Sequence, residues 1–222
     1  VLDFEEMQRR RERHYFDVDQ LTIIIDYYLE VFDNAQLERA VVFAEQLFPQ
    51  NNEIRLRRSH LLCTKERYEE AYRILQELER QEPNNTDILY ALGAVHSAMG
   101  NSKKAIQYFL KASADGYELG MVYGNIGEEY ERLGLDREAI SYYQRALEAN
   151  AQEERSLHNL CDCYGYAHLE QQGINFFTSF VDKHPYSASG WYYLGFLYQG
   201  VKLFEKAIDA FEYATTIDPA YE

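Results

Sequence analysis

The residues of this 222-residue chain best suited to covalent or metal chemistry are its cysteines, Cys63, Cys161 and Cys163. No two of them form a CxxC pair, and Cys161 and Cys163 are two residues apart, which on a helix places them on different faces. This spacing does not favour a zinc or redox site. It predicts free, buried thiols in a reducing compartment, with no metal and no cofactor.

The histidines and the lack of known catalytic motifs also argue against a metal site or an active site. Neither His60 nor His158 is expected to have a second histidine or a carboxylate at metal-binding spacing nearby in the sequence. The chain contains no Walker loop, no GxGxxG after a strand, no HExxH and no GxSxG. The sequence therefore predicts a protein that is not an enzyme.

Charge and composition exclude several classes of function. Lys and Arg number 22 against 37 Asp and Glu, a net charge of −15, which argues against binding nucleic acid or an anionic membrane. Hydrophobic residues make up 46 % of the chain, enough for a sizeable core. No apolar run is long enough to span a membrane. Free cysteines and the lack of a visible signal peptide predict a cytoplasmic protein, although a removed leader would reverse that expectation.

The four prolines reveal a repeat. Pro49, Pro83, Pro185 and Pro219 are separated by 34, 102 and 34 residues, all multiples of 34. With this period the chain divides, after an N-terminal helix or arm at residues 1–17, into six segments. They are residues 18–51, 52–85, 86–119, 120–153, 154–187 and 188–221.

Equivalent places in the segments carry equivalent residues. The eighth place is occupied by Ile25, Ser59, Gly93, Gly127, Cys161 and Gly195. The twenty-fourth place is occupied by Val41, Leu75, Phe109, Tyr143, Phe177 and Phe211. Apolar spacings of three and four predict two helices per segment, with turns at Gly100 and Gly134 and a proline closing the second helix. We expect the small residues to let paired helices approach and the aromatic residues to fill the gap.

The chain resembles the tetratricopeptide-repeat (TPR) family in these places. The last segment matches the family pattern with Trp191, Leu194, Gly195, Tyr198, Ala207, Phe211, Ala214 and Pro219. The resemblance covers residues 18–221. It implies an all-α fold, an α–α superhelix in which six helix-turn-helix repeats of 34 residues form a right-handed solenoid.

Three regions depart from the pattern. Arg55 and Arg58 stand where apolar residues are expected, and the fifth segment has Phe180 for a small residue and Gly173 for alanine. We interpret the latter two as compensating changes of volume. The charged run at residues 9–13 is typical of a solvated helix face or frayed arm, with a basic docking arm as the alternative.

In this family the first helix of each pair lines the concave surface, so the resemblance implies a set of groove-lining residues. These are Arg57, His60, Tyr90, Asn125, Glu128, Arg155, His158, Asn159, Asp162, Tyr192, Tyr193 and Phe196.

Two asparagines stand out in this set. Asn125 and Asn159 occupy the same place in successive segments, where an amide can donate to and accept from a peptide backbone. Tyr192 and Phe196 offer aromatic area for an apolar side chain. The alternatives are solvated amides and aromatic residues that pack against a further helix.

The charges in the set argue against one specialised function. A clamp for a C-terminal carboxylate needs several cations, but only Arg155 is well placed, and Glu128 and Asp162 would repel an anion. These two acids could approach each other in the groove, where we expect them to be solvated.

The sequence therefore predicts a scaffold that binds an extended peptide or protein segment, neutral or basic in charge, in the concave groove. The rival hypothesis is assembly, including homo-oligomerisation, through the apolar edge of the last helix, where Phe204, Ile208 and Phe211 should be partly uncovered. A third possibility is a spacer between domains of a larger protein.

Overall fold

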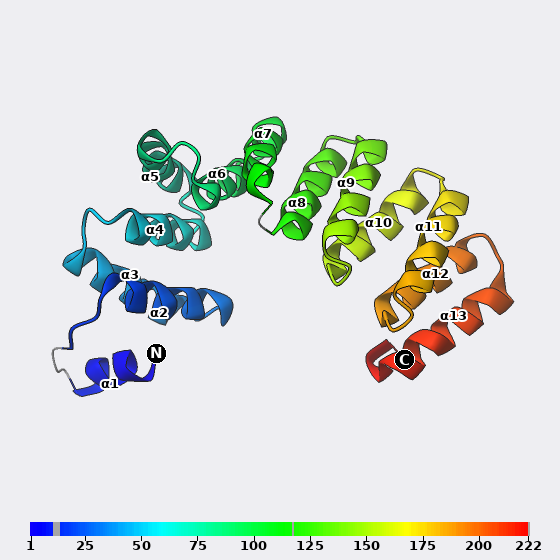
Figure 1. The fold of residues 1–222 in the computed structure, drawn as a ribbon, viewed down its shortest axis with the longest axis horizontal. Coiled ribbons are helices and arrows are strands. Elements are labelled where there is room, and N and C mark those ends of the chain that lie inside the picture. Colours follow the sequence, from blue (N-terminus) through cyan, green and yellow to red (C-terminus); the bar gives the residue numbers. More distant parts are fainter. Residues whose placement is uncertain (11–13, 117, 222) are drawn as a thin grey trace. The chain divides into compact units, whose positions relative to one another are not determined.

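A computed structural model describes residues 1–10, 14–116 and 118–221. The described residues form helices and turns and contain no strand, which confirms the expected all-α class (Figure 1). The chain divides into two compact units, Val1–Asn101 and Ser102–Glu222. In the charged run at residues 9–13, Arg9 and Arg10 are exposed at the end of a helix, and residues 11–13 lie outside the described residues.

The helices of each unit follow one another in antiparallel succession. Unit 1 contains α1 (Leu2–Arg10), α2 (Val18–Glu30), α3 (Asn34–Leu47), α4 (Asn52–Thr64), α5 (Tyr68–Gln81) and α6 (Thr86–Ala98). Unit 2 contains α7 (Ser102–Ala112), η1 (Ser113–Asp115), α8 (Leu119–Arg132), α9 (Asp136–Ala149), α10 (Glu154–Tyr166), α11 (Glu170–Lys183), α12 (Ala188–Gly200), α13 (Phe204–Ile217) and η2 (Pro219–Tyr221).

Five helices begin at a polar N-cap, Asp33 being that of α3, and the other four caps are separated by multiples of 34 residues. The side chains of Asp17, Asn51, Asn85 and Ser187 accept hydrogen bonds from backbone N–H groups in the first turns of α2, α4, α6 and α12. Each cap satisfies a donor that the helix itself leaves unpaired. The 34-residue period therefore sets where these helices begin.

The turn inside each helix pair contains one residue in the left-handed region. These residues recur every 34 positions and are Phe32, Glu66, Gly100, Gly134, His168 and Lys202. The next residue donates its N–H to a carbonyl five positions back, as Leu203 does to Tyr198 over 2.9 Å. This is the Schellman arrangement, in which glycine is the favoured residue. Two turns follow that preference and four do not.

The core of unit 1 includes the N-terminal helix. Phe4 is fully buried, and its ring centroid lies 5.7 Å from that of Phe43 and 6.0 Å from that of Phe16. Met7 is also buried. The segment predicted as a helix or arm is therefore, over residues 2–10, a helix packed on the core.

The core of unit 2 confirms the predicted contact between glycine and aromatic residues. A Cβ atom at Gly127 would lie 2.6 Å from Cε1 of Tyr143, and one at Gly195 would lie 2.7 Å from Cε1 of Phe211. Tyr143 and Phe177 are fully buried. The aromatic rings therefore occupy the volume that a side chain at each glycine would fill.

The volume compensation predicted for Phe180 involves a different glycine. A Cβ atom at Gly190 would lie 3.0 Å from the Phe180 ring, whereas one at Gly173 would meet Tyr164 at 2.9 Å and Leu197 at 3.0 Å. Phe180 is therefore accommodated by Gly190 on α12, and Gly173 accommodates the ring of Tyr164.

Burial explains the state of the three cysteines, which are free thiols. Cys161 and Cys163 are buried, and the pKa of each thiol is raised to about 12, mainly by desolvation. Cys63 is half-buried, and desolvation raises its pKa to about 11. Such thiols are poor nucleophiles at neutral pH.

The outer edge of α13 carries exposed apolar side chains. Phe204 and Ile208 are more than half exposed, as expected. Phe211 is partly buried, because its ring packs on Gly195 and on Tyr192, with ring centroids 5.6 Å apart in the latter contact. Phe211 therefore belongs to the packing of α12 on α13.

Candidate functional site

Nine of the twelve predicted groove residues lie in unit 2, on the first helices of three successive helix pairs. In this unit α10 contacts both α8 and α12. Asn125 and Glu128 lie on α8. Arg155, His158, Asn159 and Asp162 lie on α10, and Tyr192, Tyr193 and Phe196 lie on α12. We call the surface that these nine residues form the α10 face.

Glu128 and Arg155 form an ion pair between α8 and α10. The Glu128 side chain is only 15 % exposed, whereas that of Arg155 is 63 % exposed. Burial raises the pKa of the Glu128 carboxyl above its ordinary value, and Arg155 opposes this shift. The pair therefore consists of a mostly desolvated acid and a cation that reaches it from solvent.

Asn159 belongs to a hydrogen-bond chain beside this pair. Its Nδ2 donates to the Tyr143 hydroxyl over 3.2 Å, and that hydroxyl donates to Oε2 of Glu131 over 2.9 Å. Desolvation and then the hydrogen bond to Glu131 raise the pKa of Tyr143, so the phenol stays protonated. The Asn159 amide is thereby held in one orientation, with its carbonyl oxygen unpaired among the described residues.

These groups surround one cavity. A hollow of about 370 Å³ is lined by Glu128, Glu131, Arg132, Arg155 and Asn159. Asn125 is half-buried on α8. The two predicted acids are not paired with each other, because Glu128 pairs with Arg155 and Asp162 lies beside His158.

One expectation about histidine is wrong. His158 has a carboxylate one helical turn away, with its Nε2 atom 3.6 Å from Oδ2 of Asp162. The i, i+4 spacing on α10 brings the two together. The described residues contain no group of three metal-ligating side chains, so this contact is an ion pair when the histidine is protonated.

The aromatic part of the α10 face lies on α12. The ring of Tyr193 lies 5.8 Å from that of His158 and 5.4 Å from that of Tyr192, and the pKa of Tyr193 is raised to about 12, chiefly by burial. Phe196 is 51 % exposed. These side chains offer a partly packed aromatic surface next to the charged cavity.

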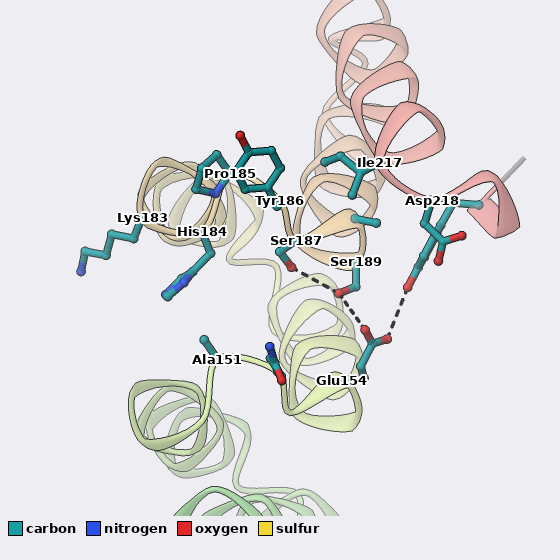
Figure 2. A pocket seen from close by; sticks show the side chains of 13 residues that line it. Ala151, Glu154, Lys183, His184, Pro185, Tyr186, Ser187, Ser189, Ile217 and Asp218 are labelled. Atoms are coloured by element: carbon teal, nitrogen blue, oxygen red, sulfur yellow. Dashed lines mark hydrogen bonds between the residues drawn. The ribbon is translucent and has the colours of Figure 1, made fainter.

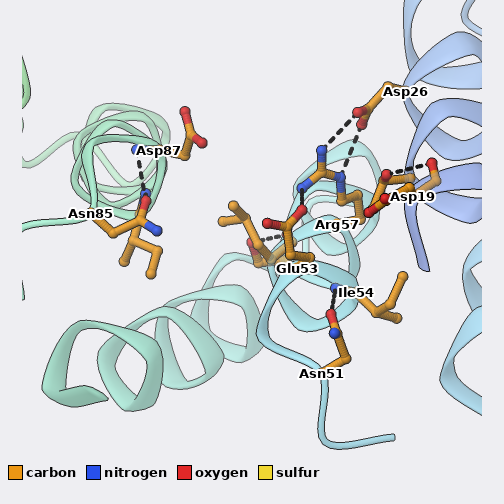
Figure 3. Close-up of polar contacts among 12 residues, drawn as sticks. Asp19, Asp26, Asn51, Glu53, Ile54, Arg57, Asn85 and Asp87 are labelled. Carbon is orange, nitrogen blue, oxygen red and sulfur yellow. Dashed lines mark hydrogen bonds and ion pairs between the residues drawn. The ribbon is translucent and has the colours of Figure 1, made fainter. Parts of the chain in front are cut away.

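The three predicted residues of unit 1 are in a different environment. Arg57 forms a bidentate pair with Asp26, at 3.1 Å from Nε to Oδ1 and 2.7 Å from Nη2 to Oδ2, and contacts Glu53 at 3.3 Å (Figure 3). Its side chain is 17 % exposed. Burial, followed by the charge of Arg57, lowers the pKa of half-buried His60. Tyr90 is half-buried on α6. The donors of Arg57 are therefore already used within unit 1.

A second cavity of unit 2 lies where α10 and α12 begin (Figure 2). It has a volume of about 720 Å³ and is lined in part by Glu154, His184, Ser187, Ser189 and Tyr221. Glu154 accepts two hydrogen bonds, from the Ser189 hydroxyl to Oε1 and from the Tyr221 hydroxyl to Oε2, both over 3.3 Å. This carboxylate therefore links α10, α12 and η2.

Comparison with known proteins places these helix pairs in a family. Sequence models of the tetratricopeptide repeat match residues 64–118 in one case and residues 122–153 and 188–221 in another, together more than half of the chain. The chain belongs to the tetratricopeptide-repeat family. TPR proteins are generally non-catalytic scaffolds, and the TPR fold of this chain implies a role in protein–protein interaction.

Solved TPR structures share its fold. The structure from a functional characterisation of Pseudomonas aeruginosa pilF is 15 % identical, with a TM-score of 0.68, over 90 % of this chain and 91 % of that one. PilW, a type IV pilus biogenesis factor, is 16 % identical with a TM-score of 0.67, over 91 % and 93 %. YrrB, a TPR protein described as having an unusual peptide-binding site, is 22 % identical with a TM-score of 0.56, over 81 % and 93 %. At these identities the likeness shows the fold, a TPR solenoid.

Several residues of the TPR surface escaped sequence reasoning. Tyr143 was predicted as a packing residue, and it also orients Asn159. Glu154 and Ser189 occupy the first turns of α10 and α12, and Tyr221 follows the last proline. Glu154 and Ser189 lie at or next to positions that the TPR resemblance assigns to the groove, so the repeat pattern could have identified them. Nothing in the sequence marks Tyr221.

Across the described residues, no helix is both long and apolar enough to cross a membrane.

Proposed function

We propose that this TPR protein binds an extended peptide or protein segment on the α10 face, within an array of six repeats with the boundaries predicted from the sequence. The observation that carries the proposal is the cluster around the smaller cavity. A rigidly oriented amide, Asn159, lies there beside a desolvated acid, Glu128, that is paired with a solvent-exposed arginine. An extended backbone offers alternating donors and acceptors that an amide can pair with.

The charges of this face favour a neutral or basic segment. Glu128, Glu131 and Asp162 outnumber the two arginines of this site, Arg132 and Arg155, and the chain as a whole carries a net charge of −15. A cation of the partner can replace Arg155 beside Glu128 while Arg155 moves into solvent. Tyr192, Tyr193 and Phe196 then supply aromatic area for an apolar side chain.

The test is a double substitution, Asn125→Ala/Asn159→Ala. Unpaired backbone groups in a covered groove should weaken peptide binding by about 1–3 kcal/mol. The ligands are peptides selected from a random-peptide library on the wild-type protein, and their affinity is measured by calorimetry. Gln171→Ala, on the second helix of its pair, is the control and should leave the affinity unchanged. Equal affinity for wild type and double variant would remove both asparagines from the site.

Assembly through α13 is the second candidate function. Phe204, Ile208 and Tyr213 are each more than half exposed on this helix, which favours a contact with another protein surface. Ile208→Glu is the suitable probe, because Phe211 is needed for packing inside unit 2. Sedimentation that shows a dimer for wild type and a monomer for Ile208→Glu would support assembly, and a monomer for both would exclude self-association through this edge.

A further inference from the structure

One side chain of this chain already lies on the predicted binding surface. The ring of Tyr221 packs against that of Tyr192, with centroids 5.3 Å apart and planes at 51°. Tyr192 is one of the aromatic residues assigned to peptide binding. The surface around Tyr192 therefore accepts a tyrosine side chain in the free protein.

The hydroxyl of Tyr221 has a dedicated acceptor. It donates to Oε2 of Glu154 on α10, 67 positions away in the sequence, over 3.3 Å. The other carboxylate oxygen, Oε1, accepts from Ser189, which is 3 % exposed on α12. Ser189 in turn lies 3.4 Å from the Ser187 hydroxyl. A buried hydroxyl thus fixes the carboxylate and leaves one oxygen for a donor that arrives over Tyr192.

The segment that carries Tyr221 is weakly attached. η2 contains no buried residue, and its turn is held locally by Asp218, whose backbone oxygen accepts from the Tyr221 N–H and whose side chain accepts from Ala220. The adjoining cavity of about 720 Å³ leaves room for another chain (Figure 2). Displacing Tyr221 breaks its ring contact with Tyr192 and the hydrogen bonds of its hydroxyl, and it moves no buried residue of η2.

We propose that Tyr192, Ser189 and Glu154 form a subsite for a tyrosine side chain of the bound segment, and that Tyr221 occupies this subsite until the partner displaces it. The proposal rests on the peptide-binding function proposed above and names one side chain of the ligand. A phenol supplies both the ring for Tyr192 and the donor for Glu154, whereas phenylalanine lacks the donor. A phosphorylated tyrosine is excluded, because its added negative charge would face Glu154.

The first test uses the side-chain analogue p-cresol and no peptide. Amide resonances of Glu154, Ser189 and Gly190 in the isotope-labelled full chain are followed by NMR during titration. Tyr221→Ala should bind p-cresol about tenfold more tightly than wild type, because the internal competitor is gone. Tyr186→Ala removes an exposed tyrosine from the same cavity and is the matched control. It should behave like wild type.

The chemistry of the subsite is tested in the same titration. Tyr221→Ala should prefer p-cresol to toluene by several-fold, and Tyr221→Ala/Glu154→Ala should lose this preference. Equal binding of p-cresol to wild type and Tyr221→Ala would overturn the proposal. Tighter binding of methylguanidinium than of p-cresol would also overturn it and would indicate a subsite for arginine instead.

The second test concerns the partner. Random-peptide selections on Tyr221→Ala should enrich tyrosine several-fold over selections on Tyr221→Ala/Glu154→Ala. If peptides bind in an asparagine-dependent way without tyrosine enrichment, the subsite is wrong and the proposed function stands. If no peptide binds any variant, both the proposed peptide-binding function and the proposed recognition of a tyrosine in the partner are wrong, whatever the p-cresol result.

Discussion

Two pairs of side chains, each 31 residues apart, occupy equivalent places in the two units. Asp26 and Arg57 in unit 1 close on each other as a bidentate ion pair. In unit 2 the same places hold Glu128 and Asn159. Glu128 takes its cation from Arg155, and the Asn159 amide is oriented by a buried tyrosine. One repeat pattern can therefore either satisfy its groove-facing groups internally or leave them available to a ligand.

The contacts inside the helix pairs differ as well. The eighth place of the repeat holds buried Ile25, Ser59 and Gly93 in unit 1, and the Ser59 hydroxyl donates to the backbone oxygen of Leu56 over 2.6 Å. In unit 2 it holds Gly127, Cys161 and Gly195, and each of the two glycines is covered by an aromatic ring. Gly127 and Gly195 therefore tolerate less added volume than the places that Ile25 and Ser59 already fill.

The largest effect that we expect comes from filling one of these glycines. Gly127→Ala places a methyl group 2.6 Å from the buried Tyr143 ring and should lower the free energy of unfolding by about 2–3 kcal/mol. Gly165→Ala is the matched control, because no atom lies within 4 Å of its added Cβ. There the better helix propensity of alanine should raise stability by about 0.5 kcal/mol. Chemical denaturation measures both, and equal values would contradict the close packing of the Tyr143 ring on Gly127.

The next effect concerns the closed pair of unit 1. Arg57→Ala leaves Asp26 and Glu53 without their shared cation and should destabilise the protein by about 1–2 kcal/mol. Arg39→Ala, which removes an exposed arginine from α3, should change stability by less than about 0.5 kcal/mol. A double-mutant cycle with Asp26→Ala isolates the pair. A coupling energy near zero would mean that the pair does not stabilise unit 1.

The turns allow a change in the opposite direction. Lys202 has φ of 63°, so Lys202→Gly removes left-handed strain and should raise the free energy of unfolding by about 0.5–1 kcal/mol. Gly134→Ala, at the equivalent turn with φ of 70°, should lower it by about 1 kcal/mol. Thermal unfolding of the two variants checks the signs, and the same sign for both would refute the role of backbone strain.

The smallest effect is a pH dependence in unit 2. The pKa of Glu128 in the folded state lies above its ordinary value of 4.5, so the ionised carboxylate lowers stability at neutral pH. Glu128→Gln should raise the free energy of unfolding by less than about 1 kcal/mol at neutral pH. This gain should fade as the pH falls toward 4.5, where the wild-type carboxyl becomes protonated. Glu148→Gln, at an exposed site on α9, is the control. If the stability gained by Glu128→Gln instead increased as the pH fell, the predicted direction of the pH dependence would be wrong.

Much of the local fold follows from the 34-residue period. The paired helices and the glycine under Tyr143 were predictable, because small and aromatic residues recur at fixed places. The left-handed turn positions were only partly predictable. Gly100 and Gly134 signal them, but Phe32 and Lys202 have no preference for that conformation, and the period alone identifies them.

The candidate site was less predictable, because the position of a residue in a repeat does not determine which neighbouring side chain it contacts. Arg57 and Arg155 were both assigned to the groove. In the structure Arg57 forms an ion pair with Asp26, whereas most of the Arg155 side chain is exposed to solvent. Tyr221 occupies the last place of the sixth segment, and no pattern in the sequence indicates its contact with Glu154, 67 positions away.

The proposed role of the α10 face is tested most directly by one calorimetric comparison. A library-selected peptide is titrated into wild type, Asn125→Ala/Asn159→Ala and Arg57→Ala. We expect the double variant in unit 2 to lose about 1–3 kcal/mol of binding free energy and Arg57→Ala, in unit 1, to bind like wild type. Unchanged affinity in the double variant, together with a loss in Arg57→Ala, would contradict the assignment of binding to unit 2.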